Sequence, residues 1–178
     1  MSLSLYEAFV PNCQQMIGAL PGMIDKGEAF AKEHGISEEE MMGCRLADDM
    51  WNLPWHIRSC WVHSAFVISL LPTGEFSPDF TELPQSWDAM RAMVAKTQSE
   101  LAAVTPEQLE AVAGNTVGFV LGGKRLMEGT AANFLLSFSQ PNVYFHATTF
   151  YDILRMKGVP LGKRDFMGMP RLKPVVAA

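Results

Sequence analysis

The chain has 178 residues, of which 48% are hydrophobic and 19% charged, a composition typical of one soluble globular domain, here expected over residues 1–170. Its formal charge of −5 argues against nucleic acid or an anionic membrane as a partner, and no apolar run approaches the ~20 residues needed to span a bilayer. Three cysteines without a CxxC spacing predict reduced thiols in a cytoplasmic protein rather than a disulfide framework.

The first predicted element is a long helix near the N-terminus. Ser4 to Glu7 form a capping box, which predicts a helix from there to about Glu33, with Gly35 ending it. Pro11 and Pro21 lie inside this range, and each lacks a backbone N–H. We therefore expect the helix to be kinked or broken.

Two further helices are predicted before residue 75. Residues 37–40 repeat the capping signature and predict a short helix. Asp48 or Asp49 can cap a second long helix, expected over residues 50–71, with Pro54 near its first turn, where a missing N–H is tolerated. The Pro-Thr-Gly sequence at residues 72–74 ends that helix.

Residues 75–80 are expected to form a loop that leads to a third long helix. Thr81 would cap this helix, with Pro84 at its third position. Apolar side chains then recur at spacings of four and three, at Leu83, Trp87, Met90, Val94, Thr97 and Leu101. A capping box at residues 105–108 predicts another short helical turn.

The only strands expected are those of one hairpin. Residues 116–121 and 124–128 flank Gly122-Gly123, a two-residue turn in which both glycines can adopt positive φ. Because an isolated hairpin is marginally stable in water, it has to pack on the helices. Thr130 then caps the final helical region, where Pro141 is expected to produce a kink.

The last helix is predicted over residues 142–157, since Gly158 and Pro160 end it. Its apolar face carries one imidazole at the margin, because His146 flanks the line of Val143, Ala147, Phe150 and Leu154. Together the elements predict a mainly all-α fold, a four-helix bundle with kinked helices, one small β-hairpin and a loose tail over residues 171–178.

The most notable polar pattern lies on the second helix, where His56, Cys60 and His63 share one stripe. At 1.5 Å per residue the two histidines are about 10 Å apart along the axis, so a straight helix cannot bring both to one metal ion. A metal would need one of them plus ligands from another helix. Cys60 beside a histidine could also form a nucleophile pair, although a cysteine among Trp55, Ile57 and Trp61 is more often inert packing.

Several longer motifs resemble a known family. They are the runs at residues 140–149 and 158–166, the Leu-Ala-x-Asp-Met sequence at 46–50 and the Leu-Gly-Gly turn at 121–123. This pattern resembles an uncharacterised bacterial family named domain of unknown function 1993, and the resemblance covers nearly the whole chain. That family is grouped with the DinB/YfiT-like four-helix bundles. Many of those bundles bind a divalent metal, such as zinc or nickel, through three histidines, and several are homodimers.

The resemblance also implies which residues form the site. His63 matches the histidine of the second helix, and His146 lies on the last helix as a metal ligand should. Asn142 and Phe150 occupy the positions four residues away, where the wider group has a second histidine, and Ser137 replaces a histidine of closer relatives. The ligand set is therefore incomplete, which implies a degenerate metal site.

Two functions follow as expectations. The first is a catalytically silent homodimer that binds a small molecule between the second and last helices, with ligand contacts from His56, Cys60, Ser137 and Asn142. The alternative is a divalent-metal-dependent thiol transferase or hydrolase, as in some relatives, with His63 and His146 as metal ligands. A partner-protein adaptor remains a third possibility if the tryptophans at 51, 55 and 61 face outward.

Overall fold

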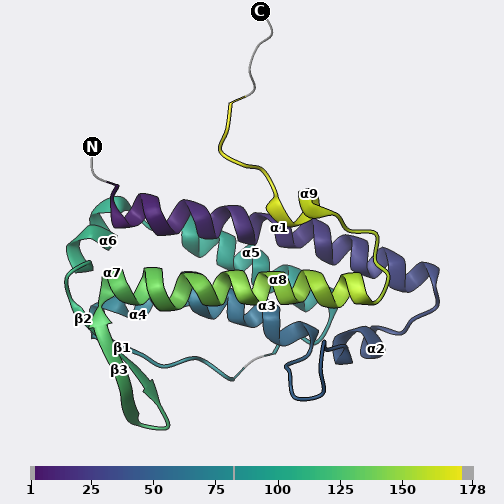
Figure 1. Cartoon of the computed structure of the whole chain (residues 1–178), viewed down its shortest axis with the longest axis horizontal. Helices are drawn as coiled ribbons and strands as arrows, with labels where there is room; N and C mark the ends of the chain where they lie inside the picture. Colours follow the sequence, from purple (N-terminus) through teal and green to yellow (C-terminus); the bar gives the residue numbers. More distant parts are fainter. Residues whose placement is uncertain (1–2, 82, 174–178) are drawn as a thin grey trace, which may run out of the picture.

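The computed structural model describes residues 3–81 and 83–173, which are mostly helical with a small three-stranded sheet. The longest helices are α1 (Leu5–Glu33), α5 (Trp87–Ala102) and α8 (Gln140–Met156), and α3 (Leu53–Trp61) lies among them. Both α1 and α3 contact α5 and α8, and Figure 1 shows the sheet beside α7 at one end of these helices. Within the described part of the chain, no helix is long and apolar enough to cross a membrane.

Helix α1 begins and ends as predicted. The Ser4 hydroxyl accepts from the Glu7 N–H, the Glu7 carboxylate accepts from the Ser4 N–H, and Gly35 beyond the end has a φ of 66°. Of the two outcomes expected at Pro11 and Pro21, a kinked or a broken helix, the break is wrong, because α1 runs through both prolines. Burial on either side of each proline holds the backbone helical despite the missing donors, as at Val10, Cys13, Leu20 and Met23.

Helix α2 (Glu38–Gly43) is capped by Ser37 as predicted, but the start of the next helix differs from the prediction. Neither Asp48 nor Asp49 caps α3, which begins at Leu53 after Asn52. The chain instead turns at residues 47–50, where the Met50 N–H donates to the Ala47 carbonyl. Pro54 then sits within the first turn, where its fixed φ favours the start of a helix.

Two stretches of π-helix interrupt the α-helical pitch. The first, η1 (Val62–Phe66), follows α3 and leads through α4 (Val67–Leu70) to the 3-10 turn η2 (Leu71–Thr73). The second, η3 (Phe134–Ser139), joins the Thr130-capped α7 (Ala131–Asn133) to α8. Pro141 lies in the first turn of α8, where a missing N–H is tolerated, and η3 ends two residues before it. Such π turns are frequent at functional sites, and the chain's candidate site lies against both of them.

Helix α5 is capped by Ser86, whose hydroxyl accepts from the Ala89 N–H, and not by Thr81 as predicted. Thr81 is engaged elsewhere, because its N–H and its hydroxyl both donate to the Asp79 carboxylate. The predicted apolar strip is confirmed from Trp87 onward, with Trp87, Met90, Val94, Thr97 and Leu101 all buried. Helix α6 (Pro106–Val112) has the predicted capping box.

The predicted hairpin is present, formed by β2 (Thr116–Leu121) and β3 (Lys124–Thr130) in antiparallel pairing. Gly122 and Gly123 have φ values of 57° and 73°, as a turn of this type requires. The expected loop at residues 75–80 is partly wrong, because β1 (Glu75–Phe76) pairs with β2 in parallel. A two-residue strand is too short to show any periodicity in the sequence, and the fully buried Phe76 anchors it.

The C-terminal region packs on α1. Helix α8 ends at Met156 before Gly158, close to the predicted boundary, and its predicted apolar line of Val143, Ala147, Phe150 and Leu154 is fully buried. The short helix α9 (Lys163–Met167) was not predicted, and its Asp165 pairs with Lys26 of α1. Residues 171–173 have no regular structure, and the rest of the predicted tail lies outside the described residues.

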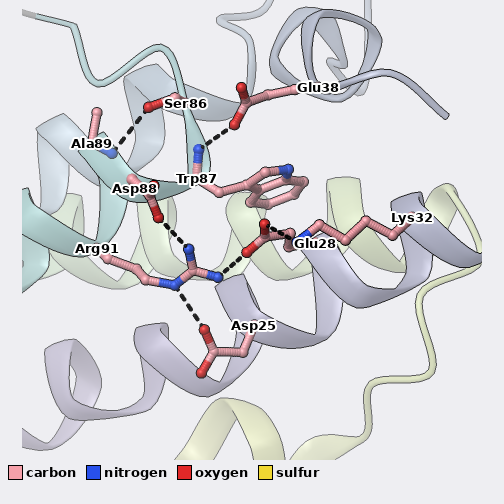
Figure 2. A network of polar contacts seen from close by, with 9 residues as sticks. All are labelled: Asp25, Glu28, Lys32, Glu38, Ser86, Trp87, Asp88, Ala89 and Arg91. Carbon is pink, nitrogen blue, oxygen red and sulfur yellow. Dashed lines mark hydrogen bonds and ion pairs between the residues drawn. The ribbon is translucent and has the colours of Figure 1, made fainter.

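A network of polar contacts links α5 to α1 on one side and to α2 on the other (Figure 2). The Arg91 guanidinium donates to Asp25, Glu28 and Asp88, and Lys32 also pairs with Glu28. Glu38 of α2 accepts from the first N–H of α5, which is one of the donors that a helix N-terminus leaves without a partner. Helix α5 is therefore linked by polar contacts both to α1 and to α2.

Candidate functional site

A cleft of about 200 Å³ opens between α3 with η1, the η3–α8 segment and the loop at residues 78–80. Aromatic side chains form much of its wall, namely Trp51, Phe80, Phe119 and Phe138. Its polar wall consists of Ser59, His63, Asp79, Asn142 and His146. A concave, mainly apolar site with a few convergent polar groups is typical of a small-molecule site.

Two histidines, His63 and His146, line this cleft, and His56 lies against His146 outside the lining. His56, His63 and His146 are 1%, 8% and 6% exposed, and the ring of His146 lies 5.2 Å from that of His56 and 6.2 Å from that of His63, centroid to centroid. The rings of His63 and His146 are nearly parallel, at 8°. The straight helix assumed for His56 and His63 is not present, because η1 begins at Val62, just before His63. Both side chains consequently reach His146 from one helical segment.

Hydrogen bonding distinguishes the three rings. The Nε2 atom of His56 lies 3.1 Å from the Trp51 carbonyl oxygen, and its Nδ1 atom lies 3.0 Å from Nδ1 of His146. The Nδ1 atom of His63 is buried and has no hydrogen-bond partner among the described residues. His63 is therefore the histidine whose polar atom remains unsatisfied in the wall of the cleft.

Burial keeps all three imidazoles uncharged near neutral pH. Desolvation lowers the pKa of His56, and it lowers the pKa of His63 to about 4. The pKa of His146 falls to about 3, mainly by burial and to a smaller extent through the neighbouring His56 and His63. Neutral imidazoles can accept a hydrogen bond or bind a metal, which protonated ones cannot.

The other predicted ligand contacts divide into two groups. Asn142 lines the cleft and donates from Nδ2 to the Phe138 carbonyl at 2.7 Å, so its Oδ1 atom remains available. Ser137 is exposed, and its hydroxyl donates to Asn133 rather than facing the cleft. Cys60 is buried outside the cleft wall, and burial raises the pKa of its thiol to about 12, so it is not a thiolate nucleophile at neutral pH.

Sequence reasoning missed the loop that closes one side of the cleft. The guanidinium of Arg58, only 2% exposed, donates to Asp79 at 3.1 Å and lies over the rings of Trp55 and Phe80 at 5.2 and 5.4 Å. Hydrogen bonds from Thr81 and the charge of Arg58 lower the pKa of Asp79. The available signal was an arginine within the otherwise apolar 53–62 stretch, because such a residue needs a carboxylate partner.

The donor set falls short of a metal centre. Within residues 3–81 and 83–173, no three His, Cys, Asp or Glu side chains are arranged to hold a metal ion. Both nitrogens of His56 are engaged in hydrogen bonds, which leaves the imidazole of His63 and the Nε2 atom of His146 as candidate metal donors. Two imidazoles do not fit a zinc or nickel site, since catalytic zinc takes three protein ligands.

Two comparisons with known proteins find relatives of this chain. The chain is similar to the crystal structure of a DinB family member protein from Shewanella denitrificans, with a TM-score of 0.81, 26% sequence identity and 96% of each chain covered. No match was found among curated proteins. The model of the family described as domain of unknown function (DUF1993) matches residues 5–167. The chain therefore belongs to the DUF1993 family.

Proposed function

We propose that this DinB-like protein binds a small molecule, about the size of one substituted ring, in the cleft between α3, η1 and α8. The observation that carries the proposal is the composition of the cleft wall, in which four aromatic side chains lie beside the polar groups of His63, Asn142 and His146. A concave, mainly apolar site with a few polar groups is the usual form of a small-molecule site.

The dimensions of the cleft support a single-ring ligand. Its volume is about 200 Å³, and an apolar cavity of roughly 150 Å³ in another protein accepts benzene. Sites for drug-sized molecules are larger, at about 300–1,000 Å³. The aromatic wall of Trp51, Phe80, Phe119 and Phe138 favours a flat ligand, because offset or edge-on ring contacts add to the energy of burial.

A fragment-binding experiment tests the proposal. Single-ring probes such as phenol and toluene should raise the melting temperature of the full chain, because a ligand that prefers the native state stabilises it. In a Val62→Phe variant the added ring projects into the cleft and should abolish the shift. The matched control is Ile68→Phe, which places the same ring in a different hollow beside α4. Equal shifts in both variants, or none in the unaltered protein, would refute the proposal.

The second candidate is a divalent-metal-dependent thiol transferase or hydrolase in which His63 and His146 are ligands. It is favoured by the parallel arrangement of these two rings and by the likeness to a DinB family member. We propose instead that the metal site is degenerate. Elemental analysis of untagged protein separates the two: stoichiometric zinc, nickel or manganese that is lost in the His63→Ala, His146→Ala double variant would establish the second candidate and overturn the first.

The proposal includes the architecture and assembly of the protein. We propose that the helices α1, α3, α5 and α8 form a four-helix bundle of the DinB/YfiT type, since each of α1 and α3 contacts both α5 and α8.

We also propose a cytoplasmic homodimer. The three free cysteines are in keeping with a cytoplasmic location, and the resemblance to dimeric bundles is in keeping with a dimer. Sedimentation velocity of the full chain tests the dimer, and a purely monomeric boundary at micromolar concentration would refute it.

A further inference from the structure

The carbonyl of Trp51 determines which nitrogen of His56 carries a proton. A carbonyl oxygen only accepts hydrogen bonds, and it lies 3.1 Å from Nε2 of His56. That nitrogen must therefore be the N–H donor. Because a neutral imidazole has one N–H, the Nδ1 atom of His56 is left with a lone pair and acts as an acceptor.

The same reasoning extends to His146. Its Nδ1 atom lies 3.0 Å from Nδ1 of His56, and two lone pairs at this distance would repel each other. Since Nδ1 of His56 is the acceptor, Nδ1 of His146 must be the donor. The Nε2 atom of His146 then has a lone pair and no hydrogen. His146 lines the cleft, and its Nε2 atom has no hydrogen-bond partner among the described residues.

We propose that the Nε2 atom of His146 accepts a hydrogen bond from the ligand and that His56 positions His146 for this role. The cleft therefore selects an uncharged single-ring molecule that bears a hydroxyl or N–H donor. This inference rests on the proposed small-molecule function and specifies the class of ligand. His56 is a positioning residue, because it acts through His146 and has both nitrogens engaged elsewhere.

The charges around the cleft agree with an uncharged ligand. Among the described residues that line it, Asp79 is the only carboxylate or basic side chain apart from the histidines, and the buried guanidinium of Arg58 neutralises it. An anionic ring would meet the Asp79 carboxylate without a free cation. A hydroxyl instead finds an acceptor at His146, and the carbonyl oxygen of Asn142 offers a second polar contact in the same wall.

The first measurement is the protonation pattern of the rings. Nitrogen-15 NMR of histidine-labelled protein at pH 7 should show His56 as the Nε2–H form and His146 as the Nδ1–H form, which is the less common tautomer of free imidazole. His146 in the Nε2–H form would overturn the inference. In His56→Leu the acceptor is removed, and His146 should revert to Nε2–H. In His56→Asn the side-chain oxygen can take the place of Nδ1, and His146 should keep its Nδ1 proton.

The second measurement compares three probes of similar size, namely phenol, anisole and toluene. Phenol carries a donor that the other two lack, and it should bind the unaltered protein about tenfold more tightly, as expected for one hydrogen bond. The advantage should disappear in His56→Leu and persist in His56→Asn, while toluene binding stays similar in all three proteins. Equal affinity for the three probes overturns this inference alone. Failure of all three to bind overturns the proposed function, and this inference with it.

Discussion

The Nδ1 atoms of His56 and His146 lie 3.0 Å apart at the contact between α3 and α8, and both side chains are almost fully buried. A contact between two identical ring atoms is attractive only when one carries a proton and the other does not. The Trp51 carbonyl determines which one does, so a backbone group bonded to His56 sets the hydrogen-bonding capacity of the His146 side chain in the cleft.

Stability and binding should respond in opposite directions at His63. In His63→Leu an unsatisfied buried nitrogen is replaced by an apolar group of similar size, which should raise the free energy of unfolding by about 1 kcal/mol. Phenol binding should weaken at the same time. Urea denaturation of the two proteins measures the first effect and titration calorimetry the second. A loss of more than about 2 kcal/mol in the variant would mean that His63 has a partner in solution, contrary to our assignment.

Acid should destabilise the protein through the same three histidines. Their pKa values lie below that of an unfolded histidine, about 6.5, at about 4 for His63 and about 3 for His146. Between pH 6.5 and 5 the unfolded chain therefore binds protons that the native state does not. Stability should be level between pH 7 and 8 and fall below pH 6.5, by up to about 1.4 kcal/mol per pH unit for each histidine.

Urea midpoints from pH 8 to pH 5 measure this dependence. A His63→Gln variant should show a shallower fall, because one of the suppressed protonations is removed. His34 is exposed at the end of α1, and His34→Gln serves as the matched control for removing a histidine from the surface. A stability that rises on acidification over this interval would contradict the neutral, buried state of the three rings.

The parts of the fold that could be predicted are those with a local chemical cause. Capping boxes at Ser4 and Thr105, paired glycines at 122–123 and the stop at Gly158 act within a few residues, and all are confirmed. Most failures depend on distant partners, since Pro11 would break an isolated helix that burial keeps intact here. Thr81 resembles a helix cap, but its donors are engaged by Asp79, only two residues earlier in the chain.

The candidate site was predictable only in part for the same reason. The resemblance to a known family identified His63 and His146, and the structure places them at one cleft. The arrangement of His56 depends on the π-helical turn η1 and on the Trp51 carbonyl, and neither has a signature in the residues themselves. Arg58 and Asp79 are separated along the chain by η1, α4, η2 and β1, so their pairing follows only from the folded backbone.

The Arg58–Asp79 pair should be important for both stability and the cleft. In Asp79→Ala the buried guanidinium loses its carboxylate, and because Asp79 is itself partly exposed we expect a loss of about 2 kcal/mol in unfolding free energy, less than for a fully buried pair. The loop that carries Phe80 should also loosen and weaken toluene binding. Arg125, which pairs with Glu75 and Glu128 on the surface, is the control, because Arg125→Ala should leave both quantities nearly unchanged. Similar losses in the two variants would contradict this assignment.

Two glycines of α1 provide the sharpest test of core packing. A Cβ atom at Gly27 would lie 3.0 Å from Cη2 of Trp87 and 3.1 Å from Cδ2 of Leu154, so the three helices α1, α5 and α8 meet there with no room for a methyl group. Gly18 is exposed on the same helix, and a Cβ atom added there would have no neighbouring atom within 4 Å. Alanine gains about 1 kcal/mol of helix propensity over glycine at either site.

At Gly27 the gain should be outweighed by overpacking, which costs about 1–3 kcal/mol, so Gly27→Ala should lower the free energy of unfolding by about 1 kcal/mol. At Gly18 no such cost applies, and Gly18→Ala should raise it by about 0.5–1 kcal/mol. Urea denaturation of both variants at pH 7 measures the two changes under identical conditions. Stabilisation by both substitutions would mean that Trp87 can move aside without penalty and that the contact among α1, α5 and α8 is looser than the structure places it.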